Sequence, residues 1–119
     1  MRNAESLLQR AIVNYVRLSA PDVLIFAVPN ASRRTTRGFA SNAVPGLMPG
    51  IPDLCIVMSA GRCAFAEIKT ELGKLSKAQA DMLDRMDDMS VPYAIVRSLQ
   101  DMQDFLYRLG IKTRARIAA

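Results

Sequence analysis

The sequence predicts an α/β domain with the element order α-β-β-β-α-β-α, in which helices cover a mixed central sheet. Apolar residues recur at helical spacing in three segments, at residues 3–18, 76–89 and 98–109. Short apolar runs of the kind found in strands lie between them, at residues 23–28, 54–58, 63–68 and 91–96. The 119 residues suffice for one core but not two. We therefore assign one domain to residues 1–110 and a basic tail to residues 111–119.

The first predicted helix, residues 3–18, has one apolar stripe formed by Leu7, Leu8, Ala11, Ile12, Tyr15 and Val16. Glu5 borders this stripe, and on the residues alone it fits an acid that the helix dipole stabilises in the first turn. The apolar run 23–28 that follows predicts a buried strand.

Residues 30–52 show no clear period, and a loop of this length in a compact domain is generally functional. Three basic residues lie in it, Arg33, Arg34 and Arg37, and four more lie near the C-terminus, Arg108, Lys112, Arg114 and Arg116. Without these seven, the remaining nine basic residues are outnumbered by 11 acidic ones, although the whole chain carries a net charge of +5. Such clustering fits a polyanion partner such as nucleic acid, and it fits solubilising segments equally well.

The runs 54–58 and 63–68 flank a turn centred near Ala60 and predict a β-hairpin. Residues equidistant from a hairpin turn face each other, so Asp53 is expected opposite Glu67, to within one residue of register. Lys69 follows Glu67 by two residues and shares its face of the strand. Three ionisable groups thus converge at one end of an apolar hairpin.

Two explanations fit this convergence. An ion pair between Lys69 and one carboxylate at a strand end is the simpler one. A divalent cation between Asp53 and Glu67 is the better one, because two adjacent carboxylates repel and burial adds a desolvation cost. Oxygen ligands suit Mg²⁺ or Mn²⁺. The chain has no histidine, which excludes common zinc sites and histidine-based catalysis.

A capping box follows the predicted hairpin: Ser76 caps a helix, and the Gln79 side chain reaches back to the backbone N–H of Ser76. Gln79 also lies on the apolar stripe of this helix, from which its amide can reach the paired acids, and the two roles are compatible. The helix methionines Met82, Met86 and Met89 are expected to fill the core. Ser98 predicts the N-cap of the last helix, and Gly110 its end.

The motif made of Pro52 and Asp53, then Glu67, Ile68 and Lys69, resembles the PD-(D/E)xK nuclease signature. Further matching stretches indicate one branch, the VRR-NUC family: residues 5–6, 29–30, 50–54, 67–70 and 73–79. The resemblance covers roughly residues 3–105 and implies a restriction-endonuclease-like core. It also implies a metal site made by Asp53, Glu67 and the backbone carbonyl of Ile68, with Glu5 joining directly or through water, and catalytic roles for Lys69 and Gln79.

The same resemblance implies a Mg²⁺-dependent DNA endonuclease, with Mn²⁺ as a substitute, acting as a homodimer on branched DNA such as a four-way junction. Candidates for contacts with the DNA backbone are Arg33, Arg34, Arg37, Lys74 and Lys77. A non-catalytic module that binds nucleic acid, or a subunit that binds a partner in a replication or repair complex, is the alternative. With neither a signal-peptide layout nor a membrane-length apolar run, we expect a cytoplasmic protein.

Overall fold

A computed structural model of the protein describes residues 2–29 and 44–114. The helices in these residues are α1 (Arg2–Ser19), α2 (Lys77–Asp88) and α3 (Leu99–Arg108). The strands are β1 (Leu24–Ala27), β2 (Leu54–Val57), β3 (Cys63–Ile68) and β4 (Tyr93–Val96). The predicted order α-β-β-β-α-β-α is confirmed, with a short 3₁₀ turn at Ser59–Gly61 as an addition.

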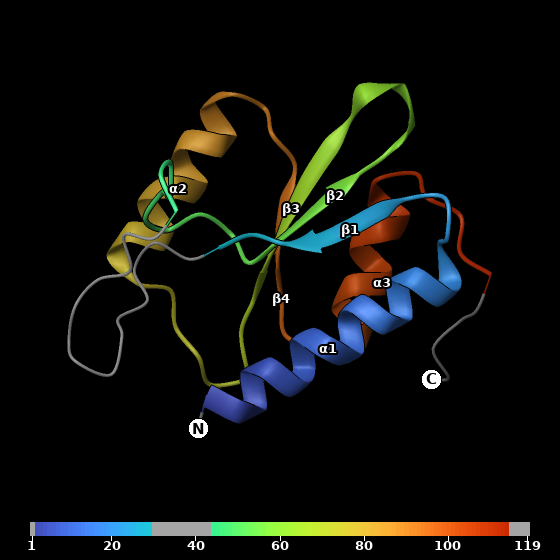
Figure 1. The fold of residues 1–119 in the computed structure, drawn as a ribbon, viewed down its shortest axis with the longest axis horizontal. Helices are drawn as coiled ribbons and strands as arrows, with labels where there is room; N and C mark the ends of the chain where they lie inside the picture. The colour runs from blue at the N-terminus through green and yellow to red at the C-terminus, as the bar shows by residue number, and fades with distance from the viewer. Residues whose placement is uncertain (1, 30–43, 115–119) are drawn as a thin grey trace.

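The four strands form one mixed sheet in the order β1-β2-β3-β4. The pairs β1–β2 and β2–β3 are antiparallel, whereas β3 and β4 run parallel. Helix α2 connects the two parallel strands and packs on one face of the sheet, while α1 and α3 pack on the other (Figure 1). This arrangement is a three-layer α/β fold in which the sheet is the central layer.

The β2–β3 hairpin has the register that the sequence predicts. Ala60 adopts a φ of 63°, and the chain reverses there so that Val57 pairs with Cys63 and Leu54 pairs with Ala66. Continuing this register by one residue places Asp53 opposite Glu67. The turn therefore determines which residues meet at the far end of the hairpin.

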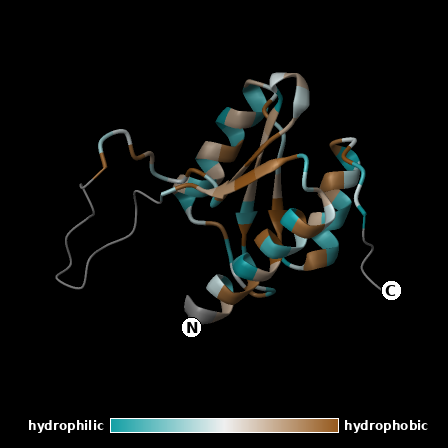
Figure 2. Ribbon diagram, turned by 45° about the vertical axis from the view of Figure 1, so that its right-hand side comes forward, coloured by the Kyte–Doolittle hydropathy of each residue, from teal (hydrophilic) through white to brown (hydrophobic). Residues whose placement is uncertain are grey.

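The main core lies between the sheet and the α1–α3 layer. Its fully buried side chains include Ile12, Val16, Ile56, Ile68, Met102 and Leu106. A smaller core under α2 contains Met82, Leu83 and Met86. Figure 2 shows apolar colour along the strands and mixed colour on the helices, as expected when only one face of each helix is buried.

The expectation that residues 23–28 form a buried strand is wrong. β1 is an edge strand, and Leu24 and Phe26 are 65% and 46% exposed whereas Ile25 is buried. The reason is the position of α2, whose small core packs against Phe65, Tyr93 and Ile95 of β3 and β4. The same face of β1 receives no such cover from α2.

The methionines of α2 differ in burial. Met82 and Met86 fill the core as predicted, but Met89 is 64% exposed. Met89 is the C-cap of α2, where the chain leaves the helix, and its side chain therefore does not continue the buried stripe. The acidic residues of α2 face solvent.

Residues 30–43 and 115–119 lie outside the described residues, and so do the predicted DNA contacts Arg33, Arg34 and Arg37. Of the predicted tail, residues 111–114 are described. Ile111 packs against the main core, and the Arg114 N–H donates to the Ser19 carbonyl at the end of α1. No helix in the described part of the chain is long and apolar enough to cross a membrane.

Candidate metal and catalytic site

Asp53 and Glu67 lie side by side where β2 begins and β3 ends. The backbone N–H of Ile68 donates to Oδ2 of Asp53 over 2.8 Å, which fixes the Asp53 carboxylate against β3. Lys69 extends from the same face as Glu67, and its Nζ lies 3.9 Å from Oε2 of Glu67. The three ionisable groups are therefore brought together at the end of the hairpin.

Glu67 is almost completely buried, with 2% of its surface exposed. Burial, the charge of Asp53 and a hydrogen bond with Asp53 together raise the pKa of the Glu67 carboxyl from 4.5 to about 8, and burial has the largest effect. The positive charge of Lys69 lowers the pKa of Glu67. Glu67 thus sits in an environment that disfavours its charge unless a proton or a cation compensates for it.

Gln79 connects α2 to this carboxylate. Its Nε2 donates to Oε2 of Glu67 over 2.9 Å, while its Oε1 accepts from the Ser76 N–H over 2.9 Å. Ser76 Oγ in turn accepts from the Gln79 N–H, which completes the capping box. The amide of Gln79 therefore completes the capping box and also reaches the Glu67 carboxylate, because its two ends face different partners. A catalytic role for Gln79 stays a prediction.

Gly50 is a structural part of the site that the sequence analysis did not identify. It adopts a φ of +80°, and a Cβ atom built on it would lie 2.2 Å from the carbonyl oxygen of Ala78. The absence of a side chain lets the segment before Asp53 pack directly on the first turn of α2. A glycine two residues before Pro52 was the available signal, but its contact with α2 is not visible in the sequence.

The strand geometry shows which oxygen atoms of the site are available as metal ligands. N–H and C=O of one strand residue point to the same edge, and the Ile68 N–H points to Asp53. The Lys69 N–H points to the opposite edge, where it donates to Val96 of β4. The Ile68 carbonyl therefore lies on the Asp53 side, and the available oxygens are those of Asp53, Glu67 and Ile68.

Glu5 lies on α1, is half-buried, and its charge is close enough to contribute to the raised pKa of Glu67. Within residues 2–29 and 44–114, no three acidic or cysteine side chains are grouped closely enough to hold a metal ion by themselves. A place for Glu5 at a shared ion, directly or through water, therefore stays a prediction.

The two predicted DNA contacts that the structure describes lie near this site. Lys74 is exposed in the connection that follows β3, and Lys77 begins α2. Lys77 Nζ lies 2.8 Å from Oδ2 of Asp81, one turn along the helix. Both partners are largely exposed, so this ion pair contributes little stability and the ammonium is available to another anion.

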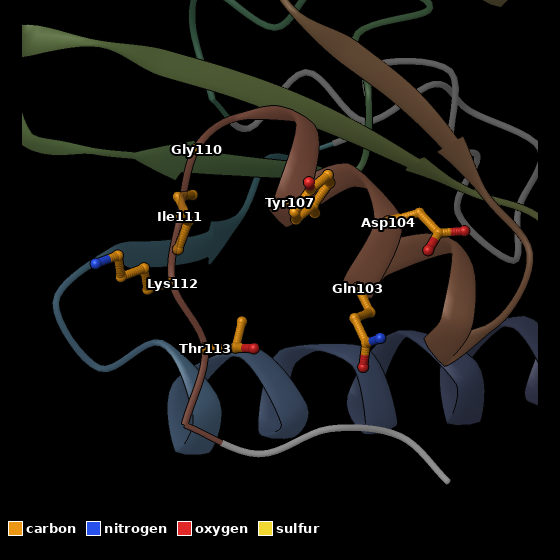
Figure 3. Close-up of a pocket in the computed structure, with 7 residues that line it drawn as sticks. All are labelled: Gln103, Asp104, Tyr107, Gly110, Ile111, Lys112 and Thr113. Carbon is orange, nitrogen blue, oxygen red and sulfur yellow. The ribbon is translucent and has the colours of Figure 1, made fainter. Parts of the chain in front are cut away.

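A separate cavity of about 560 Å³ lies on the other side of the molecule, between α3 and the segment that follows it. Figure 3 shows the residues that line it, Gln103, Asp104, Tyr107, Gly110, Ile111, Lys112 and Thr113. Asp104 is the single carboxylate among them. The cavity lacks the paired acids found at the hairpin end, which is therefore the candidate site.

Comparisons with known proteins identify the family of this domain. The family model described as the VRR-NUC domain matches residues 2–100. A solved structure described as a VRR_NUC domain has a TM-score of 0.61 and 18% sequence identity, and the similarity covers 87% of this chain and 94% of that chain. No curated protein matches the chain. The chain belongs to the VRR-NUC family, and its domain is therefore of nuclease type.

Proposed function

We propose that this protein is a Mg²⁺-dependent endonuclease that hydrolyses DNA phosphodiester bonds. The observation that carries the proposal is the placement of Asp53 opposite Glu67, with the Lys69 ammonium 3.9 Å from the Glu67 carboxylate. Two acids and an amine at the end of one hairpin supply the groups needed for metal-assisted phosphodiester hydrolysis.

The donor set fits a hard divalent cation. Asp53 and Glu67 offer carboxylate oxygens, and the Ile68 carbonyl lies on the same side of β3. Burial and the neighbouring charge of Asp53 raise the pKa of Glu67, and a cation bound by the two carboxylates would offset both effects. Mg²⁺ uses carboxylate and carbonyl oxygens together with water, and Mn²⁺ accepts the same ligands.

When bound, the ion would supply Lewis-acid activation of a water molecule and of the phosphate. The residues of the chain then have distinct tasks. Lys69 orients or deprotonates the attacking water and contacts the phosphate. Gln79 holds the Glu67 carboxylate in one orientation through its 2.9 Å hydrogen bond. Glu5, on α1, would add its negative charge to the metal site through a bridging water molecule.

Affinity for DNA would come from basic residues around the site. Lys74 precedes α2 and Lys77 begins it, near Gln79, and we propose that their exposed ammonium groups contact phosphates of the bound DNA. Arg33, Arg34 and Arg37, in the segment before Asp53, are proposed for the same task. Contacts of this type bind the backbone and carry no base specificity.

We further propose that the protein acts as a homodimer on branched DNA, with a four-way junction as the substrate. A two-fold symmetric dimer presents two equivalent sites, which matches the pair of strands that must be cut across a junction. The support for this finer proposal is the family resemblance of the motifs.

The decisive experiment is a cleavage assay on duplex, nicked, flap, fork and four-way-junction DNA, with Mg²⁺, Mn²⁺ or EDTA. We expect cleavage with either metal, highest on the junction, and none in EDTA. Asp53→Ala and Lys69→Ala should each reduce the rate at least about a hundredfold while the protein stays folded. Asp84→Ala, which removes an exposed acid from the outer face of α2, is the matched control and should cut normally.

Other results would refute the proposal. Binding of DNA without cutting under every metal condition would favour a non-catalytic binding module. Full activity of a folded Lys69→Ala protein would remove Lys69 from the mechanism. Equal rates on duplex and junction would contradict branch specificity, and a monomer in sedimentation experiments with junction DNA would contradict the dimer.

A further inference from the structure

Arg97 immediately follows β4 and is held firmly by its neighbours. The carbonyl of Val96 accepts the Lys69 N–H over 3.1 Å, which fixes the end of β4 beside the end of β3. The Arg97 N–H donates to Oδ2 of Asp101 over 2.9 Å, in the first turn of α3. The backbone from which the Arg97 side chain extends is thus anchored on both sides.

The guanidinium of Arg97 binds the turn that follows the catalytic strand. Its Nη1 lies 2.7 Å from the Thr70 carbonyl oxygen, 2.7 Å from that of Gly73 and 3.3 Å from that of Glu71. The Gly73 N–H closes the same turn by donating to the Thr70 carbonyl over 3.0 Å. One charged nitrogen therefore gathers three backbone carbonyls, and such charge-assisted bonds are stronger than neutral ones.

This turn touches the side chain of Lys69. A Cβ atom built on Gly73 would lie 3.4 Å from Lys69 Cδ and 3.3 Å from Thr70 Oγ1. The backbone of Gly73 therefore lies alongside the aliphatic part of Lys69, whose side chain is only 12% exposed. A continuous set of contacts runs from Arg97 through the turn to the amine beside Glu67.

We propose that Arg97 is a positioning residue, which holds the Thr70–Gly73 turn against Lys69 and so fixes the ammonium next to Glu67. The catalytic part of this inference rests on the proposed function. Arg97 would not touch the substrate and would act through the turn alone. All three carbonyls are bound by one guanidinium nitrogen, Nη1, so a lysine ammonium, which also carries several N–H donors, should replace these bonds only in part because it lacks the rigid planar group that fixes their direction.

The test compares Arg97→Gln and Arg97→Lys with Arg85→Gln, which removes an exposed arginine from α2 as a matched control. For DNA cleavage with Mg²⁺ we expect Arg97→Gln to lower kcat about ten- to a hundredfold, because a small misplacement of a catalytic group has an effect of this size. KM, and DNA affinity measured in EDTA, should stay at the wild-type value. Arg97→Lys should recover part of kcat, and Arg85→Gln should resemble the wild type.

A second readout does not require activity. Labelling of Lys69 by an amine-reactive reagent, followed by mass spectrometry, should rise at least about twofold in Arg97→Gln, because release of the turn exposes the amine. Gly73→Ala perturbs the other end of the same contacts by crowding Lys69, and it should also lower kcat without changing KM. This variant decides the matter if Arg97→Gln fails to fold.

The outcomes separate the two proposals. A wild type that does not cleave refutes the proposed function, while Lys69 labelling still decides whether Arg97 holds the turn. If the wild type cleaves and kcat is unchanged in folded Arg97→Gln, the positioning role is refuted. A loss of DNA affinity equal to the loss of kcat would also refute it, since Arg97 would then be a DNA contact.

Discussion

The raised pKa of Glu67 predicts a specific dependence of stability on pH. The unperturbed carboxyl titrates at 4.5, whereas Glu67 in the folded protein titrates at about 8. The folded state therefore holds the proton more tightly than the unfolded state. The resulting stabilisation is fully present below pH 4.5, falls as the pH rises from 4.5 to about 8, and does not change further above that range.

The perturbation that isolates this effect is Glu67→Gln, which keeps the size of the side chain and cannot ionise. Between pH 5 and 7.5, Glu67 should make the stability of the metal-free wild type fall by at most about 1.4 kcal/mol per pH unit relative to the variant. Acids far from the site contribute equally to both proteins, so the difference between them reports Glu67 together with its interaction with Asp53. The measurement is urea-induced unfolding in EDTA at several pH values.

Binding of Mg²⁺ should displace the proton of Glu67. At pH 7 a carboxyl with a pKa of about 8 carries roughly 0.9 of a proton, which an incoming Mg²⁺ must displace. Calorimetric titration of Mg²⁺ at pH 7, in two buffers with different ionisation enthalpies, should therefore show release of nearly one proton. At pH 9.5 the release should approach zero.

Two results would refute this reasoning. Parallel stability curves for the wild type and Glu67→Gln would show that the Glu67 carboxyl is not perturbed in the folded protein. Magnesium binding at pH 7 without proton release would show that the ion does not displace a proton from Glu67, and the proposed ligand set would then be wrong.

Three further predictions concern the packing around the site. In thermal unfolding, Gly50→Ala should destabilise the protein by about 3 kcal/mol or more, because its Cβ would lie 2.2 Å from the Ala78 carbonyl oxygen. Gly46→Ala is the control, with a φ of +90° but no atom within 4 Å of its Cβ, and it should cost only about 1–2 kcal/mol. Gln79→Glu should preserve the capping box and change the melting temperature by no more than a few degrees. It should lower the cleavage rate, because it replaces the hydrogen-bond donor to Glu67 by a third acid. A normal cleavage rate would contradict this prediction. In chemical denaturation, Ile25→Ala should lower the free energy of unfolding by about 2–4 kcal/mol and Leu24→Ala by less than about 1 kcal/mol, because Ile25 is 4% exposed and Leu24 is 65% exposed. Equal losses of stability would mean that the outer face of β1 is covered in solution.

Much of the site could be predicted because local rules govern it. A hairpin pairs residues by their distance from the turn, so locating the turn at Ala60 was enough to place Asp53 opposite Glu67. The capping box likewise depends on residues three apart, which are neighbours at the start of any helix. The helical and strand periods gave the order of the elements for the same reason.

Other features depend on contacts between segments far apart in the chain. The exposure of Leu24 and Phe26 follows from where α2 packs on the sheet, and no pattern within residues 23–28 reports the position of that helix. The close approach of Gly50 to α2 joins segments separated by 28 residues, and the three carbonyls bound by Arg97 lie 24 to 27 residues before it.

The sequence by itself determined the elements, the hairpin register, the paired acids with their neighbouring lysine, and the family resemblance, because each of these depends on local spacing. The tertiary structure decided which faces are covered, how deeply Glu67 is buried, and which groups hold it and Lys69 in place. Burial and long-range hydrogen bonds arise only when separate segments pack together, and the pKa of Glu67 is raised by that packing.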